Sequence, residues 1–161
     1  MAKTILNKNN QLRWLLLSVL VIILDQVSKM LISAHLVMNK PLQILPVFNL
    51  VLQHNAGAAF GFLRDETGWQ RILFVTIAAV ISIAIIRTLA KLPRNENITA
   101  FALALILGGA IGNVYDRVAL GYVVDFISLH FHDWYFATFN IADSAITVGV
   151  IIWLTANWFK K

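Results

Sequence analysis

The chain has 161 residues, of which 59% are hydrophobic and 13% are charged, and it carries a net charge of +5. Soluble domains are about 45–50% apolar and about 25% charged, so this composition excludes a disordered chain, a collagen-like chain and an ordinary water-soluble enzyme. The absence of cysteine excludes disulfides, thiolate metal sites, a cysteine nucleophile and palmitoylation. A multi-pass membrane protein is indicated.

Four long apolar runs predict four membrane-spanning helices. We place them at residues 12–32, 70–89, 98–116 and 139–159. At a rise of about 1.5 Å per residue, each can cross a hydrocarbon core of about 30 Å with interfacial ends. The first run follows basic residues, as in a signal peptide, but a polar cluster without an A-x-A site comes after it, so we expect a retained helix. No repeat or linker is present, and we expect one domain over residues 1–161.

The Lys and Arg residues predict the orientation of these helices. Eight of the thirteen lie in the segments before the first run, between the second and third and after the fourth, or within three residues of those segments: Lys3, Lys8, Arg13, Arg87, Lys91, Arg94, Lys160 and Lys161. Cytoplasmic segments carry an excess of Lys and Arg, so both termini are expected to be cytoplasmic, with outer loops at residues 33–69 and 117–138. The positive charge is then a topological signal, and since no basic–aromatic platform is present, no nucleic-acid partner is expected.

The two outer loops differ in character. Residues 42–52 are β-prone, with a partial alternation that Pro46 interrupts, and they predict a small sheet on the outer face. Residues 117–138 are rich in aromatic side chains, which suit the membrane interface, and we expect an interfacial loop or helix there. The predicted fold class is an all-α membrane protein, a four-helix bundle with a small extracytoplasmic β-element.

Charged residues within the spans are costly and mark candidate functional positions. Asp25 and Lys29 are spaced i,i+4 and are expected to pair on one helix face, either as a self-neutralised structural pair or as support for a site near the outer surface. Residues 108–112 form a G-x-x-x-G that lets a neighbouring helix approach closely. Asp116 beside Arg117 is interpreted as an interfacial ion pair.

The fourth run opens with Asn140 as a good N-cap and Asp143 at the third helical position, where the helix dipole favours a carboxylate. The predicted topology also collects polar side chains at the outer membrane face: Asn55, Asn113, Arg117, Asp125, Asn140 and Asp143. Two carboxylates there suggest an aspartyl dyad that shares one proton. As the partner of Asp143 we favour Asp125, which has apolar neighbours, over Asp116, which has an adjacent arginine.

Other readings of these residues are weaker. Ser28 and Lys29 diverge by about 100° on a helix, which disfavours a Ser–Lys dyad. Residues 130–133 (HFHD) are candidate metal ligands if the segment is extended, but such residues are more often interfacial. A small transporter that uses Asp25, Lys29 and Asp143 as a proton relay would need polar residues across the full membrane depth, and a non-enzymatic assembly protein would not need the convergent polar groups.

Five sequence blocks in this order resemble the bacterial lipoprotein signal peptidases, also called signal peptidase II. The blocks are residues 25–29 (DQVSK), 55–61 (NAGAAFG), 108–117 (GGAIGNVYDR), 123–127 (VVDFI) and 139–144 (FNIADS). The resemblance implies an intramembrane aspartyl endopeptidase in the bacterial cytoplasmic (inner) membrane, with its active site at the outer face. Its substrates would be prolipoproteins that carry diacylglycerol on the lipobox cysteine, and it would cut just before that cysteine.

The resemblance also assigns roles to residues. Asp125 and Asp143 would be the catalytic pair. The groups that would hold the substrate backbone, orient the pair or support the site are Asn55, Asn113, Arg117, Asn140, Gly109, Ala142, Asp25, Lys29 and Asp116. No cofactor and no metal are implied. The expected partners are lipid-modified prolipoproteins, membrane lipid and globomycin-type inhibitors, a monomer is expected, and the outer loops are expected to clamp the substrate from above.

Overall fold

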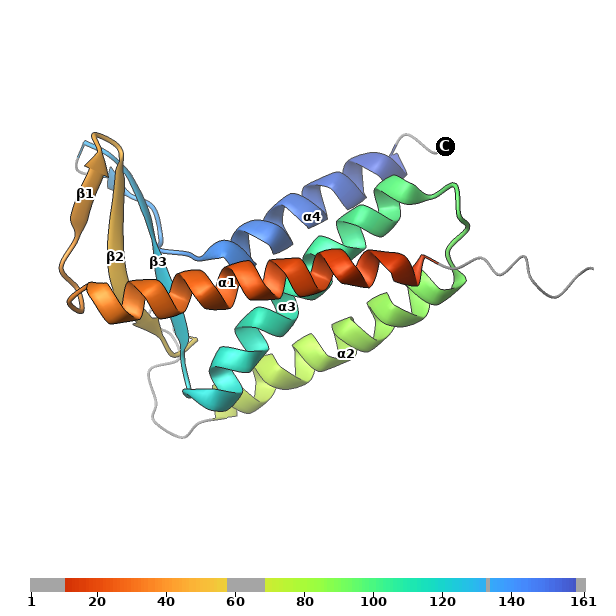
Figure 1. Cartoon of the computed structure of the whole chain (residues 1–161), viewed down its shortest axis with the longest axis horizontal. Coiled ribbons are helices and arrows are strands. Elements are labelled where there is room, and N and C mark those ends of the chain that lie inside the picture. Colours follow the sequence, from red (N-terminus) through yellow and green to blue (C-terminus); the bar gives the residue numbers. More distant parts are fainter. Residues whose placement is uncertain (1–10, 58–68, 133, 159–161) are drawn as a thin grey trace, which may run out of the picture.

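Four long helices form the body of the molecule (Figure 1). The computed structural model describes residues 11–57, 69–132 and 134–158. A short 3-10 turn, η1 (Leu12–Trp14), leads into α1 (Leu15–His35); the other helices are α2 (Trp69–Lys91), α3 (Asn97–Ala119) and α4 (Ile141–Trp158). Each is long and apolar enough to cross a membrane, so the prediction of four spans is confirmed.

Helix α3 is the centre of the bundle. In its most apolar window 56% of the residues are buried, against 22% for the first span and 11% each for α2 and α4, and it runs obliquely between α2 and α4 (Figure 1). A Cβ added at Gly108 would lie 2.8 Å from the Ser18 carbonyl oxygen, and one added at Gly112 would lie 2.7 Å from Asp25 Oδ2. The close helix approach predicted for the G-x-x-x-G segment is therefore confirmed, and the neighbour is α1.

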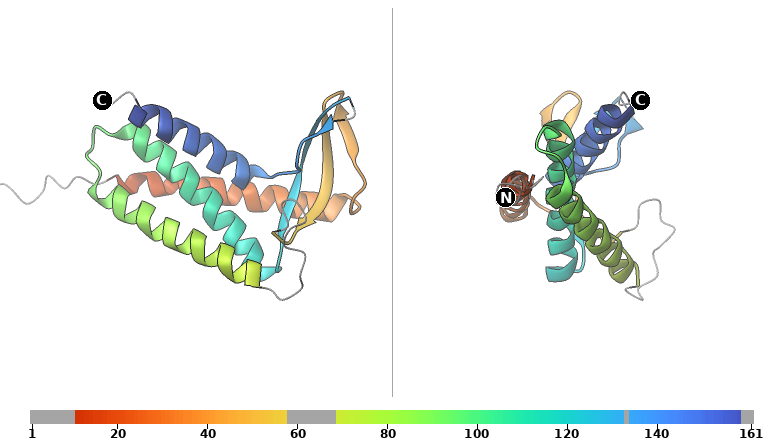
Figure 2. Two further views of the ribbon diagram at one scale, coloured as in Figure 1. Left: turned by 180° about the vertical axis from the view of Figure 1, so that it is seen from behind. Right: turned by 90° about the vertical axis from the view of Figure 1, so that its right-hand side faces the viewer.

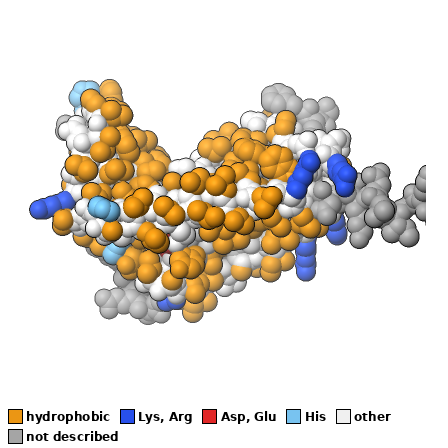
Figure 3. Space-filling view, in the orientation of Figure 1, with side chains coloured by type: hydrophobic (Ala, Val, Ile, Leu, Met, Phe, Trp, Pro, Cys, Tyr) orange, Lys and Arg blue, Asp and Glu red, His pale blue; other side chains and the backbone are white. Residues whose placement is uncertain are grey.

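The sides of the bundle are apolar and its two ends differ. Large hydrophobic side chains stand exposed on the helices, among them Leu16 (77%), Ile72 (69%) and Met30 (68%), as expected for a surface that faces lipid. The start of α1, the α2–α3 connection and the end of α4 lie together at the end away from the strands (Figure 2). Most Lys and Arg side chains on the visible face gather at that same end (Figure 3).

An antiparallel sheet covers the opposite end of the bundle. Its strands β1 (Leu42–Leu45), β2 (Phe48–Asn55), β3 (Val123–Phe131) and β4 (Trp134–Tyr135) are ordered β1-β2-β3-β4. The predicted small sheet is confirmed, and Pro46 falls between β1 and β2, where no ladder hydrogen bond is lost. Pairing of β2 with β3 sets Gln53 opposite Asp125 and Asn55 opposite Val123, so the end of β2 lies beside Asp125.

The prediction of an interfacial loop or helix over residues 117–138 is wrong for Val123–Phe131, which form a strand. The aromatic residues of this segment suggested a membrane interface, whereas its β-branched residues find a partner strand in β2. The fourth helix also begins at Ile141 rather than at residue 139, because the Phe139 backbone is hydrogen-bonded to Phe126 and Ile127 of β3. The first helix continues to His35, three residues beyond the predicted end.

Candidate active site

The N-terminus of α4 is closed by a reciprocal pair of hydrogen bonds. Asn140, which is fully buried, accepts a hydrogen bond from the Asp143 backbone N–H through Oδ1 (2.9 Å) and donates its own backbone N–H to Asp143 Oδ2 (3.3 Å). This arrangement is a capping box with a carboxylate at the third position. The predicted N-cap is confirmed, and the Asp143 carboxylate is held at the helix end.

The same asparagine also contacts Asp125. Its Nδ2 donates to Asp125 Oδ1 at 2.7 Å and lies 3.2 Å from Asn113 Oδ1. The second oxygen of Asp125 accepts from Asn55 Nδ2 at 2.9 Å, and Asp143 Oδ1 accepts from Asn113 Nδ2 at 2.8 Å. Each carboxylate therefore accepts a hydrogen bond from Asn140 at one oxygen and from a second asparagine at the other. Five residues from distant parts of the sequence meet in this one network.

The two carboxylates differ in exposure. Asp125 is only 3% exposed, whereas Asp143 is half-buried. Burial raises the pKa of Asp125 from 3.8 to about 6; the hydrogen bond from Asn55 opposes this rise, and the nearby Asp143 charge adds to it. The pair thus combines a carboxyl group that takes up a proton readily with one that is open to the surroundings.

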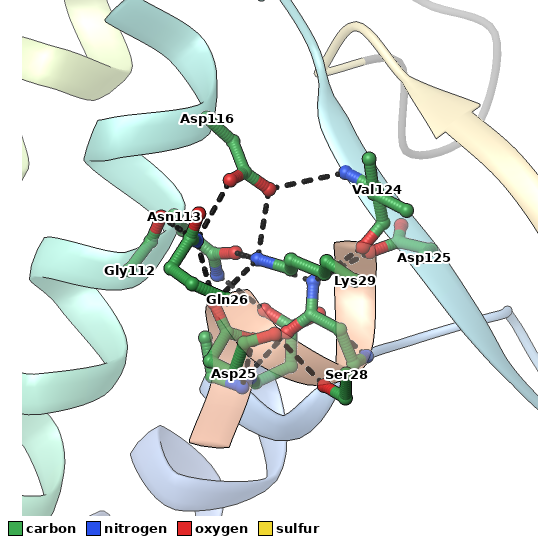
Figure 4. Close-up of polar contacts among 12 residues, drawn as sticks. Asp25, Gln26, Ser28, Lys29, Gly112, Asn113, Asp116, Val124 and Asp125 are labelled. Atoms are coloured by element: carbon green, nitrogen blue, oxygen red, sulfur yellow. Dashed lines mark hydrogen bonds and ion pairs between the residues drawn. The ribbon is translucent and has the colours of Figure 1, made fainter. Parts of the chain in front are cut away.

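A buried ion cluster lies beside this pair (Figure 4). Lys29 Nζ is 2.7 Å from Asp25 Oδ2, 2.8 Å from Asp116 Oδ2 and 3.2 Å from Asn113 Oδ1. The predicted Asp25–Lys29 pair is confirmed, and Asp116 is a third member. The expected pairing of Asp116 with Arg117 is wrong, because successive residues on a helix point about 100° apart, and Asp116 faces α1.

The ion cluster holds the backbone next to both carboxylates. Asp25 Oδ1 accepts from the Ala142 N–H (2.9 Å), and Asp116 Oδ2 accepts from the Val124 N–H (3.2 Å). Ala142 and Val124 directly precede Asp143 and Asp125. A buried charge cluster that is fully hydrogen-bonded in this way fixes the position of the chain around it.

Sequence reasoning assigned no role to Gln26, which the structure places between the two carboxylates of the cluster. Its Nε2 donates to Asp116 Oδ1 (2.8 Å) and lies 3.1 Å from Asp25 Oδ2 (Figure 4). The available signal was an amide side chain inside a membrane span, directly after a carboxylate. Amides in spans hydrogen-bond across helices, so this position qualified as a candidate.

Arg117 points toward α2. Its Cζ lies 4.9 Å from the ring centroid of Phe74, and its Nη1 is 3.4 Å from the Asn113 carbonyl oxygen. The buried Nε has no hydrogen-bond partner among the residues that the structure describes. The guanidinium therefore lies over the Phe74 ring in a cation–π contact and is also attracted by the carboxylates of Asp143, Asp125 and Asp116. Phe74 was not predicted, since nothing distinguishes it from the other apolar residues of its span.

Two small residues give the site its close packing. Gly57 has φ +99° and donates its N–H to Asn55 Oδ1 (2.9 Å), a turn that orients the Asn55 amide toward Asp125. A Cβ at Gly109 would overlap the Ala142 carbonyl oxygen, so this glycine lets α3 meet the start of α4. Residues 58–61 of the second sequence block lie outside the described residues.

The alternative sites have different surroundings. Ser28 Oγ donates to the Asp25 carbonyl oxygen at 2.8 Å, and Lys29 belongs to the ion cluster, so these two residues do not form a dyad. The His130 ring stacks on Tyr135 with centroids 5.0 Å apart. Within residues 11–57, 69–132 and 134–158, no three His, Asp or Glu side chains are grouped as metal ligands; residue 133 of the HFHD segment falls outside these ranges.

Comparisons with known proteins identify the relatives of this chain. The family model described as signal peptidase (SPase) II matches residues 17–159. A lipoprotein signal peptidase of Pseudomonas fluorescens is 51% identical over 153 residues, covering 94% of this chain and 89% of that protein. The lipoprotein signal peptidase of Pseudomonas aeruginosa is 50% identical over 153 residues, covering 94% of this chain and 90% of its own.

Solved structures give the same result at the level of the fold. A bacterial membrane enzyme solved at 1.9 Å superposes with a TM-score of 0.84 and 32% identity, covering 98% of this chain and all of the other. A second bacterial membrane enzyme, solved at 2.3 Å, gives a TM-score of 0.82 and 33% identity over 96% of this chain and 93% of that one. The chain therefore belongs to the signal peptidase II family, an aspartic peptidase family of the membrane.

Proposed function

We propose that this peptidase removes signal peptides from prolipoproteins that carry diacylglycerol on the lipobox cysteine, and that it cuts just before that cysteine. The relatives that are about half identical are lipoprotein signal peptidases, and the five sequence blocks carry the resemblance to them. The apolar sides of the helices suit a substrate that is anchored in the bilayer by both its signal peptide and its lipid.

The observation that carries the mechanism is the double role of Asn140, which hydrogen-bonds to Asp125 and to Asp143. Two nearby carboxylates do not both ionise comfortably, so the pair holds one proton. Buried Asp125, with its pKa raised to about 6, is the member that holds this proton. Half-buried Asp143 is then the ionised member and the base.

The reaction is an attack of water on the scissile peptide carbonyl. Asp143 takes a proton from water as its oxygen bonds to the carbonyl carbon, and Asp125 gives its proton to the carbonyl oxygen. The tetrahedral intermediate collapses when the C–N bond breaks: the proton on Asp143 passes to the leaving amine of the cysteine residue, and one hydroxyl group of the intermediate returns its proton to Asp125 as the carbonyl re-forms. No covalent enzyme intermediate forms, and the chain needs no metal for these steps.

The remaining polar residues position the pair and the substrate. Asn55 donates a hydrogen bond to Asp125 Oδ2, and Asn113 donates one to Asp143 Oδ1, so each fixes the carboxylate oxygen that does not contact Asn140. We assign to Arg117, whose charge interacts with those of Asp143 and Asp125, the donation of a hydrogen bond to the substrate backbone. The Lys29 cluster, through Asp25 and Asp116, supports the chain beside both carboxylates.

We further propose that the sheet end of the bundle faces outward and the basic end faces the cytoplasm, in accordance with the distribution of Lys and Arg. Both termini are then cytoplasmic, the active site lies at the outer face, and the substrate enters sideways from the lipid. We expect a monomer to suffice, since all the proposed site residues belong to one chain, and we expect globomycin-type inhibitors to compete with the substrate.

The first test replaces each member of the pair by asparagine. Asp125→Asn and Asp143→Asn should each fold in the membrane and slow the cleavage of a diacylglyceryl-modified prolipoprotein in proteoliposomes by at least about 10²–10⁴-fold, the usual contribution of an acid or base. The matched control is Asp116→Asn, which should have a lower yield or rate but retain measurable turnover. A precursor without the lipid should remain uncut by the unaltered enzyme.

Two outcomes would contradict the assignment. Normal cleavage by Asp125→Asn or Asp143→Asn would remove that residue from the pair. If Asp116→Asn had the same thermal stability as the other two variants and were equally inactive, Asp116 would have to replace Asp125 in the proposal.

A further inference from the structure

Gln26 contacts the Lys29 cluster, and the proposed reaction gives it no role. Its side chain is half-buried on α1, one residue after Asp25. Its Nε2 lies 2.8 Å from Asp116 Oδ1, 3.1 Å from Asp25 Oδ2 and 3.3 Å from the Gly112 carbonyl oxygen (Figure 4). One amide group therefore reaches two carboxylates that belong to different helices, α1 and α3.

Gln26 completes the hydrogen bonding of Asp116, which is only 1% exposed. Asp116 Oδ2 is 2.8 Å from Lys29 Nζ and accepts the Val124 N–H at 3.2 Å. Among the residues that the structure describes, Gln26 is the one hydrogen-bond donor to Asp116 Oδ1. A buried charged oxygen that loses its donor is strongly destabilised, so without the Gln26 amide this carboxylate would turn toward another donor.

Asp25 depends on the same amide. Its Oδ1 accepts the Ala142 N–H at 2.9 Å, while its Oδ2 is 2.7 Å from Lys29 Nζ and 3.1 Å from Gln26 Nε2. The single positive charge of Lys29 faces the two negative charges of Asp25 and Asp116. The neutral donors of Gln26 therefore supply part of the stabilisation that the ammonium group alone does not give to two buried carboxylates.

The carboxylates that Gln26 contacts hold the backbone beside the proposed pair. Each accepts an N–H from the residue before a member of the pair, namely Ala142 before Asp143 and Val124 before Asp125. The hydrogen bonds of Gln26 go to neither member of the pair. Any effect of Gln26 on the reaction is therefore transmitted through the Lys29 cluster.

We propose that Gln26 is a positioning residue for the peptidase reaction: its amide keeps Asp25 and Asp116 directed at the backbone N–H groups that precede the two catalytic aspartates. The inference rests on the proposed assignment of that pair. A displacement of about 1 Å at a reacting group can lower a rate by about 10²-fold, so the loss of this amide should lower kcat. KM should not change, because Gln26 does not contact Arg117, to which we assign substrate binding.

The first experiment compares Gln26→Met with Ser18→Ala. The methionine keeps the length of the side chain and removes the amide. In the control, Ser18 Oγ donates to the Ala104 carbonyl oxygen at 2.8 Å, so Ser18→Ala removes another buried hydrogen bond between α1 and α3, about two helical turns away. In proteoliposomes that contain a lipidated precursor, Gln26→Met should lower kcat about 10–100-fold with KM unchanged. Ser18→Ala should lose similar thermal stability but keep the kcat of the unaltered protein.

The second experiment uses Gln26→Glu. At low pH the introduced carboxyl group is neutral, and its O–H can donate to Asp116 Oδ1; at high pH it is ionised, cannot donate and adds a third negative charge. The ratio of the kcat of Gln26→Glu to that of Gln26→Met should therefore be above one at about pH 5 and below one at about pH 8. The other titratable groups around this position are common to both variants and cancel in the ratio: Asp25, Lys29, Tyr115, Asp116, His54 and Tyr122.

Several results would overturn the proposal. They are an unchanged kcat in Gln26→Met, an equal fall of kcat in Ser18→Ala, a rise of KM alone, and a ratio that does not depend on pH. If Gln26→Met fails to fold, the kcat of Gln26→Glu relative to the unaltered protein decides the question, because it should rise toward one as the pH falls. Normal cleavage by Asp125→Asn or Asp143→Asn would contradict the pair itself, and since it is measured on separate variants, the two failures are distinguishable.

Discussion

Asn140 is the residue on which the candidate site converges. An amide side chain offers both an acceptor and a donor, and here Oδ1 caps the Asp143 N–H while Nδ2 reaches Asp125. An aspartate at this position would keep the cap but lose the donor, and it would set a third carboxylate beside the pair. A serine would cap the helix but has no amide N–H to donate to Asp125. Only an amide joins the helix end to the strand.

The stability of the protein should depend on the protonation of Asp125. Its pKa is raised to about 6 by burial, so the folded state binds this proton more tightly than the unfolded state does. The contribution of this proton to the free energy of unfolding, roughly 3 kcal/mol, is then fully present below about pH 4 and is lost as the pH rises through 6. In thermal unfolding from pH 4 to 7, the unaltered protein should lose stability relative to Asp125→Asn, which cannot ionise.

A difference between these two proteins that stays constant from pH 4 to pH 7 would show that Asp125 titrates alike in the folded and unfolded states. Asp125 would then have no reason to be the protonated member of the pair. Measurements in one detergent, at one ionic strength, keep the other titrating groups common to both proteins.

The two carboxylates that Asn140 contacts could be selected from the sequence because each belongs to a short motif with a local meaning. Asp143 follows an N-cap, and Asp125 stands among apolar neighbours. The partner of Asp116 was not predictable in the same way, since adjacency to Arg117 says nothing about which helix each side chain faces. The role of Phe74 could not be predicted either, because its contact with Arg117 depends on how α2 packs against α3.

At the scale of elements, α3 joins the separate parts of the site. One face of this helix, at Gly108 and Gly112, meets α1, while the adjoining Gly109 meets α4 at Ala142. Small residues let helix backbones approach closely in membranes. This approach brings the Asp25 carboxylate within hydrogen-bond reach of the Ala142 N–H at the start of α4.

Gly109→Ala should therefore impair activity more than Gly108→Ala does. The added methyl group at Gly109 overlaps the Ala142 backbone, which cannot rotate away, so the start of α4 and Asp143 must shift. At Gly108 the methyl group meets Ser18 and Val21 of α1, which precede Asp25 on that helix and do not contact α4 at Ala142. Both variants should lose about 1–3 kcal/mol of stability to overpacking, but only Gly109→Ala should lose most of its turnover rate in the prolipoprotein cleavage assay.

Similar thermal stability together with equal turnover in the two variants would show that the contact between α3 and α4 does not set the geometry of the pair. The comparison is matched because the two glycines are adjacent in one helix and receive the same side chain.

The elements differ in how far they could be predicted. The four helices follow from apolar runs, since length and hydrophobicity alone decide whether a segment crosses a membrane. The strand β3 does not, because a segment that alternates imperfectly takes its structure from a partner, and β2 lies some seventy residues earlier in the chain. The register of these two strands, which brings Asn55 to Asp125, is a tertiary feature.

At the scale of the whole molecule, the sheet and the basic residues mark opposite ends of the bundle (Figures 1 and 3). The chain has no cysteine, so single cysteines can report which end faces out. In spheroplasts, Val47→Cys in the exposed turn between β1 and β2 should react with a membrane-impermeant maleimide. Asn95→Cys in the exposed α2–α3 connection should react only after the membrane is permeabilised, and the reverse pattern would invert the proposed topology.

The measurement that tests the central claim most directly is single-turnover cleavage by Asp125→Asn, Asp143→Asn and the double variant, with enzyme in excess over a lipidated precursor. Residues that act as one unit are not additive. If the two carboxylates jointly activate one water, all three variants should share the same residual rate within about threefold. A double variant whose loss equals the product of the two single losses would show that Asp125 and Asp143 act independently, and the shared-proton account would be contradicted.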